Sequence, residues 1–263
     1  MLIVHADGIG TARLDDDDGR SILNHVVRPL AAKTAAKPVR AKWPASMATV
    51  GGPMSWTTAA HHGVLELDKI VRDRPDDKLI LLGYSGGCRV IHDWLDQRPD
   101  DHHRVVAVGL MSDPYRPYGR KQHGVPHTSG WGVCGQRLGP LPGLTLWTTH
   151  PSDVISNALS DALLRTFADL SDKIPGGLFD DLRGHHERAD WQLLWQLGIL
   201  RTNPLAYFGT LGYRLEQAHR DIHGYLTGAH TRGYTDPFPA PDGTTDSLAH
   251  RLAASIAWKV DHP

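Results

Sequence analysis

The sequence is poor in cysteine, in long apolar runs and in net charge, and each shortage excludes a class of protein. Two cysteines, Cys88 and Cys134, cannot form a disulfide framework, although a single bridge between them is left open. Cys88 lies in a helical pattern, where we expect a buried free thiol. No run reaches the roughly 18 apolar residues of a membrane-spanning helix, so we expect no transmembrane segment.

A net charge of −1 provides no overall field that would attract nucleic acid. The first ten residues become polar too soon for a secretion signal and are typical of a first strand. We therefore expect a protein made in the cytoplasm without a signal peptide and without a nucleic-acid partner. Nothing in the pattern predicts an oligomeric state.

Histidine is abundant in an otherwise ordinary composition, with 17 residues. Most are expected on the solvated surface. His219 and His223 are four residues apart and could share a helix face, as metal-binding pairs do. The residues between them, Arg-Asp-Ile, lack the glutamate of a zincin. We therefore expect no metal and no cofactor.

Apolar segments that are typical of buried strands alternate with helical patterns. Four continuous apolar runs are predicted to be strands: residues 2–4, 79–82, 105–111 and 144–147. Apolar residues follow a helical period at 59–71 and again at 90–95. Strands that are apolar throughout and are separated by helices are typical of a parallel sheet covered on both faces. The sequence therefore predicts an α/β fold with a central, mostly parallel sheet.

The pattern changes after residue 153. Helical patterns, one of them rich in tryptophan, occupy much of 156–220, and no linker or repeat divides the chain. A last amphipathic helix is predicted at 249–257. We expect one domain, residues 1–263, with a helical insertion at about 156–220.

The segment Gly83-Tyr-Ser-Gly-Gly87 joins a predicted strand to a predicted helix. A serine on such a sharp turn is exposed at the edge of the sheet, and the flanking glycines let neighbouring chains approach closely. The helix that follows begins with unpaired N–H groups. We predict that Ser85 is a nucleophile and that the N–H of Gly86 faces a developing oxyanion.

A serine nucleophile requires an acid and a base, which in α/β-hydrolases follow in the order Ser, acid, His. Asp153 follows the strand predicted at 144–147 and is our candidate acid. Asp113 is the competitor, in a context that is typical of a structural turn. His230, in a glycine-bounded loop before the last helix, is our candidate base. The other histidines late enough in the chain are His219, His223 and His250.

A second oxyanion donor usually comes from the loop after an early strand. The loop Asp7-Gly-Ile-Gly10 fits, with the N–H of Ile9 as the candidate donor. The alternative is a dinucleotide-binding fingerprint, which requires a third glycine where Arg13 stands.

With these residues, the chain resembles the cutinase-like serine esterases of the α/β-hydrolase fold, and among them the phage lysin B enzymes. Five segments carry the resemblance: Trp43-Pro-Ala-Ser46, Gly83-Tyr-Ser-Gly-Gly87, Ser112-Asp-Pro-Tyr-Arg-Pro-Tyr-Gly119, Gly130-Trp-Gly-Val-Cys-Gly135 and Pro151-Ser-Asp153. His230 with Tyr234 is similar to a His-x-x-Tyr of the family, spaced one residue wider. Gly86 stands where these enzymes have glutamine.

The resemblance implies a mycolylarabinogalactan esterase, which cleaves the ester between mycolic acids and arabinogalactan during phage lysis. Ser85, Asp153 and His230 would then form the triad, with Gly86 and Ile9 as the oxyanion hole. Trp191 and Trp195 of the insertion would wall a groove for acyl chains or belong to the core. The substrate would be this or another long-chain lipid ester of the envelope, reached after release at lysis.

Two other functions are compatible with the same residues. One is a general cutinase-like lipase or esterase that acts on other esters. The other is a catalytically silent hydrolase fold that binds the cell wall. The complete set of serine, aspartate and histidine argues against the silent fold.

Overall fold

The structure is a computed structural model of the chain. It describes residues 1–262 except 12–20, 48–49, 123, 140, 166–167, 169–202, 204, 206–208 and 241–242. Trp191 and Trp195 of the expected insertion therefore lie outside the described residues.

A five-stranded parallel sheet forms the centre of the described chain, in the order β2-β1-β3-β4-β5. Its strands are β1 (Leu2–Ala6), β2 (Lys37–Arg40), β3 (Leu79–Tyr84), β4 (Val105–Met111) and β5 (Leu144–Thr148). A small antiparallel pair, β6 (Pro237–Pro239) and β7 (Thr245–Ser247), lies near the C-terminus. The parallel sheet predicted from the apolar runs is confirmed.

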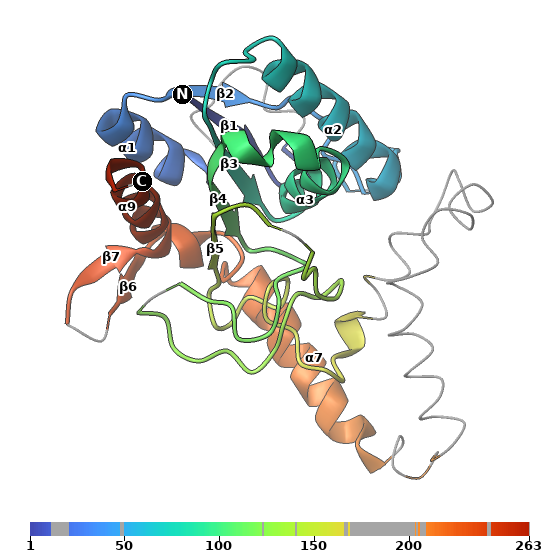
Figure 1. The fold of residues 1–263 in the computed structure, drawn as a ribbon. Coiled ribbons are helices and arrows are strands. Elements are labelled where there is room, and N and C mark those ends of the chain that lie inside the picture. Colours follow the sequence, from blue (N-terminus) through green and yellow to red (C-terminus); the bar gives the residue numbers. More distant parts are fainter. Residues whose placement is uncertain are drawn as a thin grey trace.

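Helices cover both faces of this sheet (Figure 1). In the figure, α1 and α9 lie together on one side and α2 and α3 on the other, while α7 extends away below the sheet. The helices are α1 (Asn24–Thr34), α2 (Trp56–Arg72), α3 (Gly87–Gln97), the 3₁₀ helix η2 (Pro99–Arg104), α7 (Leu211–Leu226), α8 (Arg232–Thr235) and α9 (Leu248–Asp261).

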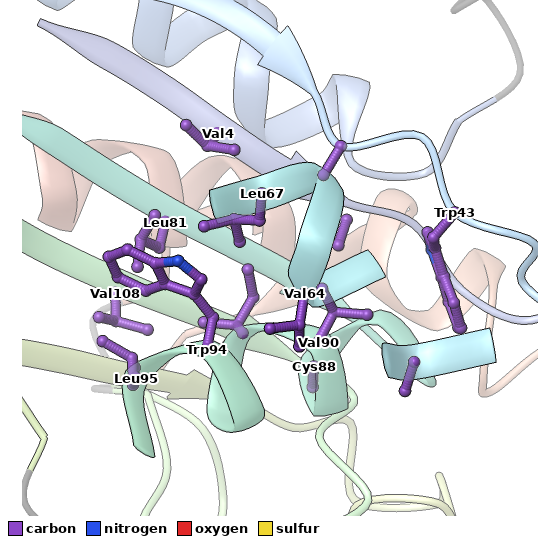
Figure 2. Close-up of a cluster of buried hydrophobic side chains, with 14 of the residues drawn as sticks. Val4, Trp43, Val64, Leu67, Leu81, Cys88, Val90, Trp94, Leu95 and Val108 are labelled. Carbon is purple, nitrogen blue, oxygen red and sulfur yellow. The ribbon is translucent and has the colours of Figure 1, made fainter. Parts of the chain in front are cut away.

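Strand β3 shows why the predicted strands are apolar throughout. Its residues Leu79 and Leu81 pack in the cluster formed with α2 and α3, whereas Ile80 and Leu82 pack in the cluster formed with α1 and α9. Successive side chains point to opposite faces of a strand, and here both faces are covered. Figure 2 shows the first cluster, with the buried indole of Trp94 close to Leu81.

Serine caps fix the starts of two of the covering helices. The Ser55 Oγ accepts a hydrogen bond from the N–H of Thr58 at the start of α2. The Ser247 Oγ does the same for the N–H of His250 at the start of α9. Each cap satisfies one of the backbone donors that a helix leaves unpaired, which contributes about 1 kcal/mol.

Helix α1 and strand β2 of the central fold escaped the sequence patterns, as did the short elements η2, α8, β6 and β7. Helix α1 contains Pro29, and β2 is a four-residue edge strand, Lys-Pro-Val-Arg, with no apolar run. Neither Cys88 nor Cys134 is in a disulfide, and Cys88 is buried as expected. No helix within the described ranges has the length and apolar character to cross a membrane. Of the expected insertion, the described part ends in α7, which extends past residue 220 to Leu226.

We predict acid sensitivity from the partly buried ion pair that ties α2 to the end of α3. The Asp68 carboxylate accepts from two Arg98 nitrogens at 2.6 and 3.0 Å. This hydrogen bonding lowers the pKa of Asp68 below its usual value, although burial opposes the shift. A lowered pKa stabilises the fold above the unfolded value of about 4, and that stability is lost as the pH falls through the folded pKa.

Asp68→Asn should therefore lower the melting temperature at pH 7. Between pH 7 and about pH 3, the melting temperature of the variant should fall by fewer degrees than that of the wild type. Thermal unfolding followed by circular dichroism across this range is the measurement. If the melting temperatures of the two proteins fall in parallel as the pH is lowered, Asp68 contributes nothing to the acid sensitivity.

Candidate active site

The loops that follow neighbouring strands meet at the carboxyl edge of the sheet. Gly8 and Ile9 follow β1, Ser85 follows β3, Ser112 follows β4 and Asp153 lies five residues beyond β5. Ligands of open parallel sheets bind at this edge. The topology thus brings three residues that the sequence analysis singled out, Ile9, Ser85 and Asp153, to the same edge of the sheet as Ser112.

Ser85 occupies a strained turn between β3 and α3. Its φ of 51° is in the left-handed region, which costs a non-glycine residue about 1–3 kcal/mol. The backbone holds this conformation because the Ser85 N–H donates to the Met111 carbonyl at 2.9 Å and the Ser85 carbonyl accepts from Cys88 at 3.0 Å. No described residue hydrogen-bonds the Ser85 Oγ, which leaves this hydroxyl available for chemistry.

The glycines around Ser85 are required by close approaches of other atoms. A Cβ added to Gly87 would lie 2.2 Å from the Ala6 carbonyl oxygen. A Cβ on Gly83 would lie 2.8 Å from the Cα of Cys88. At Gly86 the space is filled by the side chain of Ile9, which would lie 2.5 Å from an added Cβ. A glutamine at position 86 would collide with Ile9, so the two residues fit each other.

The backbone N–H groups of Ile9 and Gly86 lie near Ser85, where the sequence analysis expects an oxyanion hole. Gly8 packs against Ser85, since a Cβ on Gly8 would be 3.2 Å from the Ser85 Cβ. The Ile9 nitrogen would lie 3.5 Å from a Cβ on Gly86. Within the described chain, the N–H groups of Ile9 and Gly86 donate to no protein acceptor. Backbone N–H groups without a protein acceptor are the kind of donor that an oxyanion hole requires.

The loop that carries Ile9 is anchored at its base by Asp7. The Asp7 carboxylate pairs with Arg40 at 2.9 Å and accepts from the Ser21 hydroxyl. Its backbone carbonyl accepts from the Trp43 indole N–H at 3.0 Å. These bonds hold the loop in place before a substrate arrives, which is the preorganisation that an oxyanion hole needs.

His230 lies in the turn between α7 and α8 and is almost fully buried. Its ring stacks between two tyrosines, with centroid distances of 5.3 Å to Tyr84 and 4.9 Å to Tyr225. The Tyr84 hydroxyl also donates to the His230 carbonyl at 2.6 Å. The Nδ1 atom faces Asp153 Oδ1 at 3.2 Å. Nε2 is therefore the ring nitrogen left to accept a proton.

No hydrogen bond joins His230 to Ser85 within the described part of the chain. In ligand-free hydrolases this contact is often long and tightens when substrate binds. The structure thus pairs His230 with Asp153, and Ser85 directly follows Tyr84, on which the His230 ring stacks.

Asp153 is completely buried and surrounded by donors. It accepts from His230 Nδ1, from the N–H of Ile155 at 3.1 Å, and from the hydroxyls of Ser112 at 2.5 Å, Tyr234 at 2.6 Å and Ser156 at 3.3 Å. Burial alone would raise the pKa of Asp153, but the charge and hydrogen bond of His230 and the hydroxyls lower it below the usual value. The carboxylate is therefore ionised at neutral pH.

The competing candidates have other partners. Asp113 is fully buried and accepts from His92 Nε2 and from the Trp147 indole, both at 2.9 Å, so it belongs to a separate buried network.

The competing histidines also have other partners. His250 pairs with Asp246 at 3.1 Å on the surface of α9. His219 and His223 stack on each other along α7. Over the described ranges, no three metal-ligating side chains gather at one point.

Sequence reasoning assigned no role to Ser112, Tyr84 or Tyr225, each of which contacts His230. Tyr234 was noted only through the resemblance, and the structure places its hydroxyl on Asp153. The sequence feature that could have identified Ser112 is its position directly after β4, the strand that pairs with β3, which leads into the Ser85 turn.

The fold and this edge together define the α/β-hydrolase class. A parallel sheet carries a serine on a strand-to-helix turn, followed in the chain by a buried aspartate and then by a histidine paired with it. The order and the placement are those of the α/β-hydrolases, as the sequence predicted.

Solved structures to which the chain is similar include a lysin B, an acetyl xylan esterase and a cutinase-like protein. Lysin B from Mycobacteriophage D29 has 16% sequence identity and a TM-score of 0.49, covering 78% of this chain and 90% of that chain. Acetylxylan esterase at 0.90 Å resolution has 15% identity and a TM-score of 0.45, covering 65% and 93%. A cutinase-like protein from Cryptococcus sp. has 14% identity and a TM-score of 0.44, covering 65% and 88%.

The sequence itself matches no protein-family model and no curated protein.

Proposed function

We propose that the protein is a carboxylic ester hydrolase in which Ser85 is the nucleophile, His230 the base and Asp153 the acid. The observation that carries the proposal is the buried Asp153–His230 pair beside a serine whose Oγ is unengaged by any described residue. Two backbone N–H groups without acceptors in the described chain lie next to that serine. This is the arrangement that acyl transfer requires.

The reaction would proceed through an acyl-enzyme. His230 Nε2 takes the proton of the Ser85 hydroxyl while Oγ attacks the ester carbonyl, and the N–H groups of Gly86 and Ile9 receive the negative oxygen. The imidazolium, held by Asp153, returns its proton to the leaving alcohol. Water then attacks the acyl-enzyme by the same route and releases the carboxylic acid.

For the substrate, we propose the ester between mycolic acids and arabinogalactan of a mycobacterial-type cell wall, cleaved during phage-mediated lysis. The support is the resemblance of residues 112–119 and 130–135 to lysin B segments, together with the cutinase-like serine turn at residues 83–87. In this proposal, the protein is made in the host cytoplasm and reaches the envelope when the cell is lysed.

The substrate is tested by incubating the purified protein with mycobacterial-type cell wall and measuring free mycolic acids by mass spectrometry. We expect release by the wild type and none by Ser85→Ala. A short soluble ester is assayed in parallel. Cleavage of the short ester without release of mycolic acids would favour a general cutinase-like esterase and contradict the proposed substrate.

A further inference from the structure

Ser112 is a second buried serine at the carboxyl edge of the sheet. It follows β4 directly and has no solvent exposure. Its hydroxyl oxygen lies 2.5 Å from Asp153 Oδ2 and 3.0 Å from His230 Nδ1. Ser112 therefore contacts both residues of the acid–base pair at the same time.

The direction of these hydrogen bonds follows from the donors that are present. An ionised Asp153 can only accept, so the hydroxyl proton of Ser112 points to Oδ2. The lone pairs of the Ser112 oxygen then face the N–H at Nδ1 of His230. That N–H is shared between the Ser112 oxygen at 3.0 Å and Asp153 Oδ1 at 3.2 Å.

The backbone of Ser112 is strained in the same way as that of Ser85. Its φ is 54°, against 51° for Ser85. The two serines follow the paired residues Tyr84 and Met111 of neighbouring strands, so they lie beside each other at the sheet edge. A glycine would adopt this conformation without strain, and a strained residue is retained where its side chain serves a purpose.

We infer that Ser112 is a positioning residue that holds the Nδ1 proton of His230 together with Asp153. This inference rests on the proposed hydrolase function. By offering a second acceptor, the Ser112 hydroxyl fixes both the tautomer and the ring orientation of His230, so that Nε2 faces the nucleophile. The bond from Ser112 to Asp153 Oδ2 also fixes the carboxylate beside the end of β4, so that the carboxylate stays aligned with the imidazole of His230.

Two variants separate this role from a purely structural one. Ser112→Ala removes the hydroxyl and keeps the backbone strain, whereas Ser112→Gly removes the hydroxyl and relieves the strain. For both, we expect kcat on a short soluble ester to fall about 10- to 100-fold with KM changed less than about twofold. Ser112→Gly should melt at a higher temperature than Ser112→Ala, although its activity is equally low.

A further measurement does not depend on turnover. Proton NMR of the wild type should show a downfield resonance from the shared Nδ1 proton of His230, and this resonance should shift or broaden in both Ser112 variants. Wild-type kcat with an unchanged resonance in Ser112→Gly would overturn the inference. If the wild type cleaves no ester but the resonance responds as expected, the proposed function fails while the contact stands.

Discussion

Replacement of Ser85 by alanine is expected to lower ester hydrolysis by about 10⁶-fold in kcat, the size of effect seen when a triad nucleophile is removed. The reason is that Ser85 is the proposed nucleophile: it lies on the turn after β3 that also carries the Gly86 N–H, and it packs against Gly8 of the loop that carries Ile9. His230 and the oxyanion donors would remain and would support only weak catalysis by water. The measurement is the rate of hydrolysis of a chromogenic short-chain ester.

A matched serine serves as the control for this loss. Ser255 lies on α9, outside the site, and its Oγ donates only to the Arg251 carbonyl of its own helix. Ser255→Ala should retain wild-type activity. Both variants should keep the far-ultraviolet circular dichroism of the wild type. More than about 1% residual activity in Ser85→Ala would mean that the nucleophile lies elsewhere.

The largest expected loss of stability comes from Arg116, a fully buried cation that holds the loops around the acid. Its guanidinium donates to four backbone carbonyls, those of Ser156 at 2.6 Å, Arg120 at 2.6 Å, Gly130 at 2.7 Å and Pro117 at 3.2 Å. Arg116→Met would leave the buried Ser156 and Gly130 carbonyls without this donor, whereas the Pro117 carbonyl would keep its bond from the Arg120 N–H. We expect the free energy of unfolding to fall by about 3–5 kcal/mol, measured by urea denaturation.

Activity should decline along with stability in this variant, because Ser156 also bonds Asp153 through its hydroxyl. The matched control is Arg120→Met, which removes the same group from an exposed position. Its free energy of unfolding should change by less than about 0.5 kcal/mol. An Arg116→Met protein that unfolds at the same urea concentration as the control would contradict the account of these loops.

Much of the fold was predictable because its strands are buried on both faces. Residues 79–82 and 105–111 read as apolar throughout, since each strand packs against helices on two sides. The edge strand β2 and helix α1 gave no comparable signal. A four-residue strand containing proline has no apolar period, and Pro29 interrupts the helical pattern of α1.

The candidate triad was predictable because its members are tied to recognisable turns in a fixed chain order. Ser85 follows a strand, Asp153 follows another and His230 precedes the last helix, and the structure brings the aspartate and histidine within 3.2 Å. The residues that hold His230 were not predictable in this way. Ser112 reaches it through the register of β3 and β4, and Tyr225 reaches it from α7. Such contacts depend on tertiary packing, which local patterns do not encode.

The measurement that tests the central claim most directly is covalent labelling with a fluorophosphonate, followed by mass spectrometry of the digested protein. The account predicts one adduct, located on Ser85, and no adduct in the Ser85→Ala variant. It also predicts strongly slowed labelling in His230→Ala, since the base activates the serine. A folded wild-type protein that remains unlabelled, or that carries its label on another residue, would contradict the assignment of Ser85 as the nucleophile.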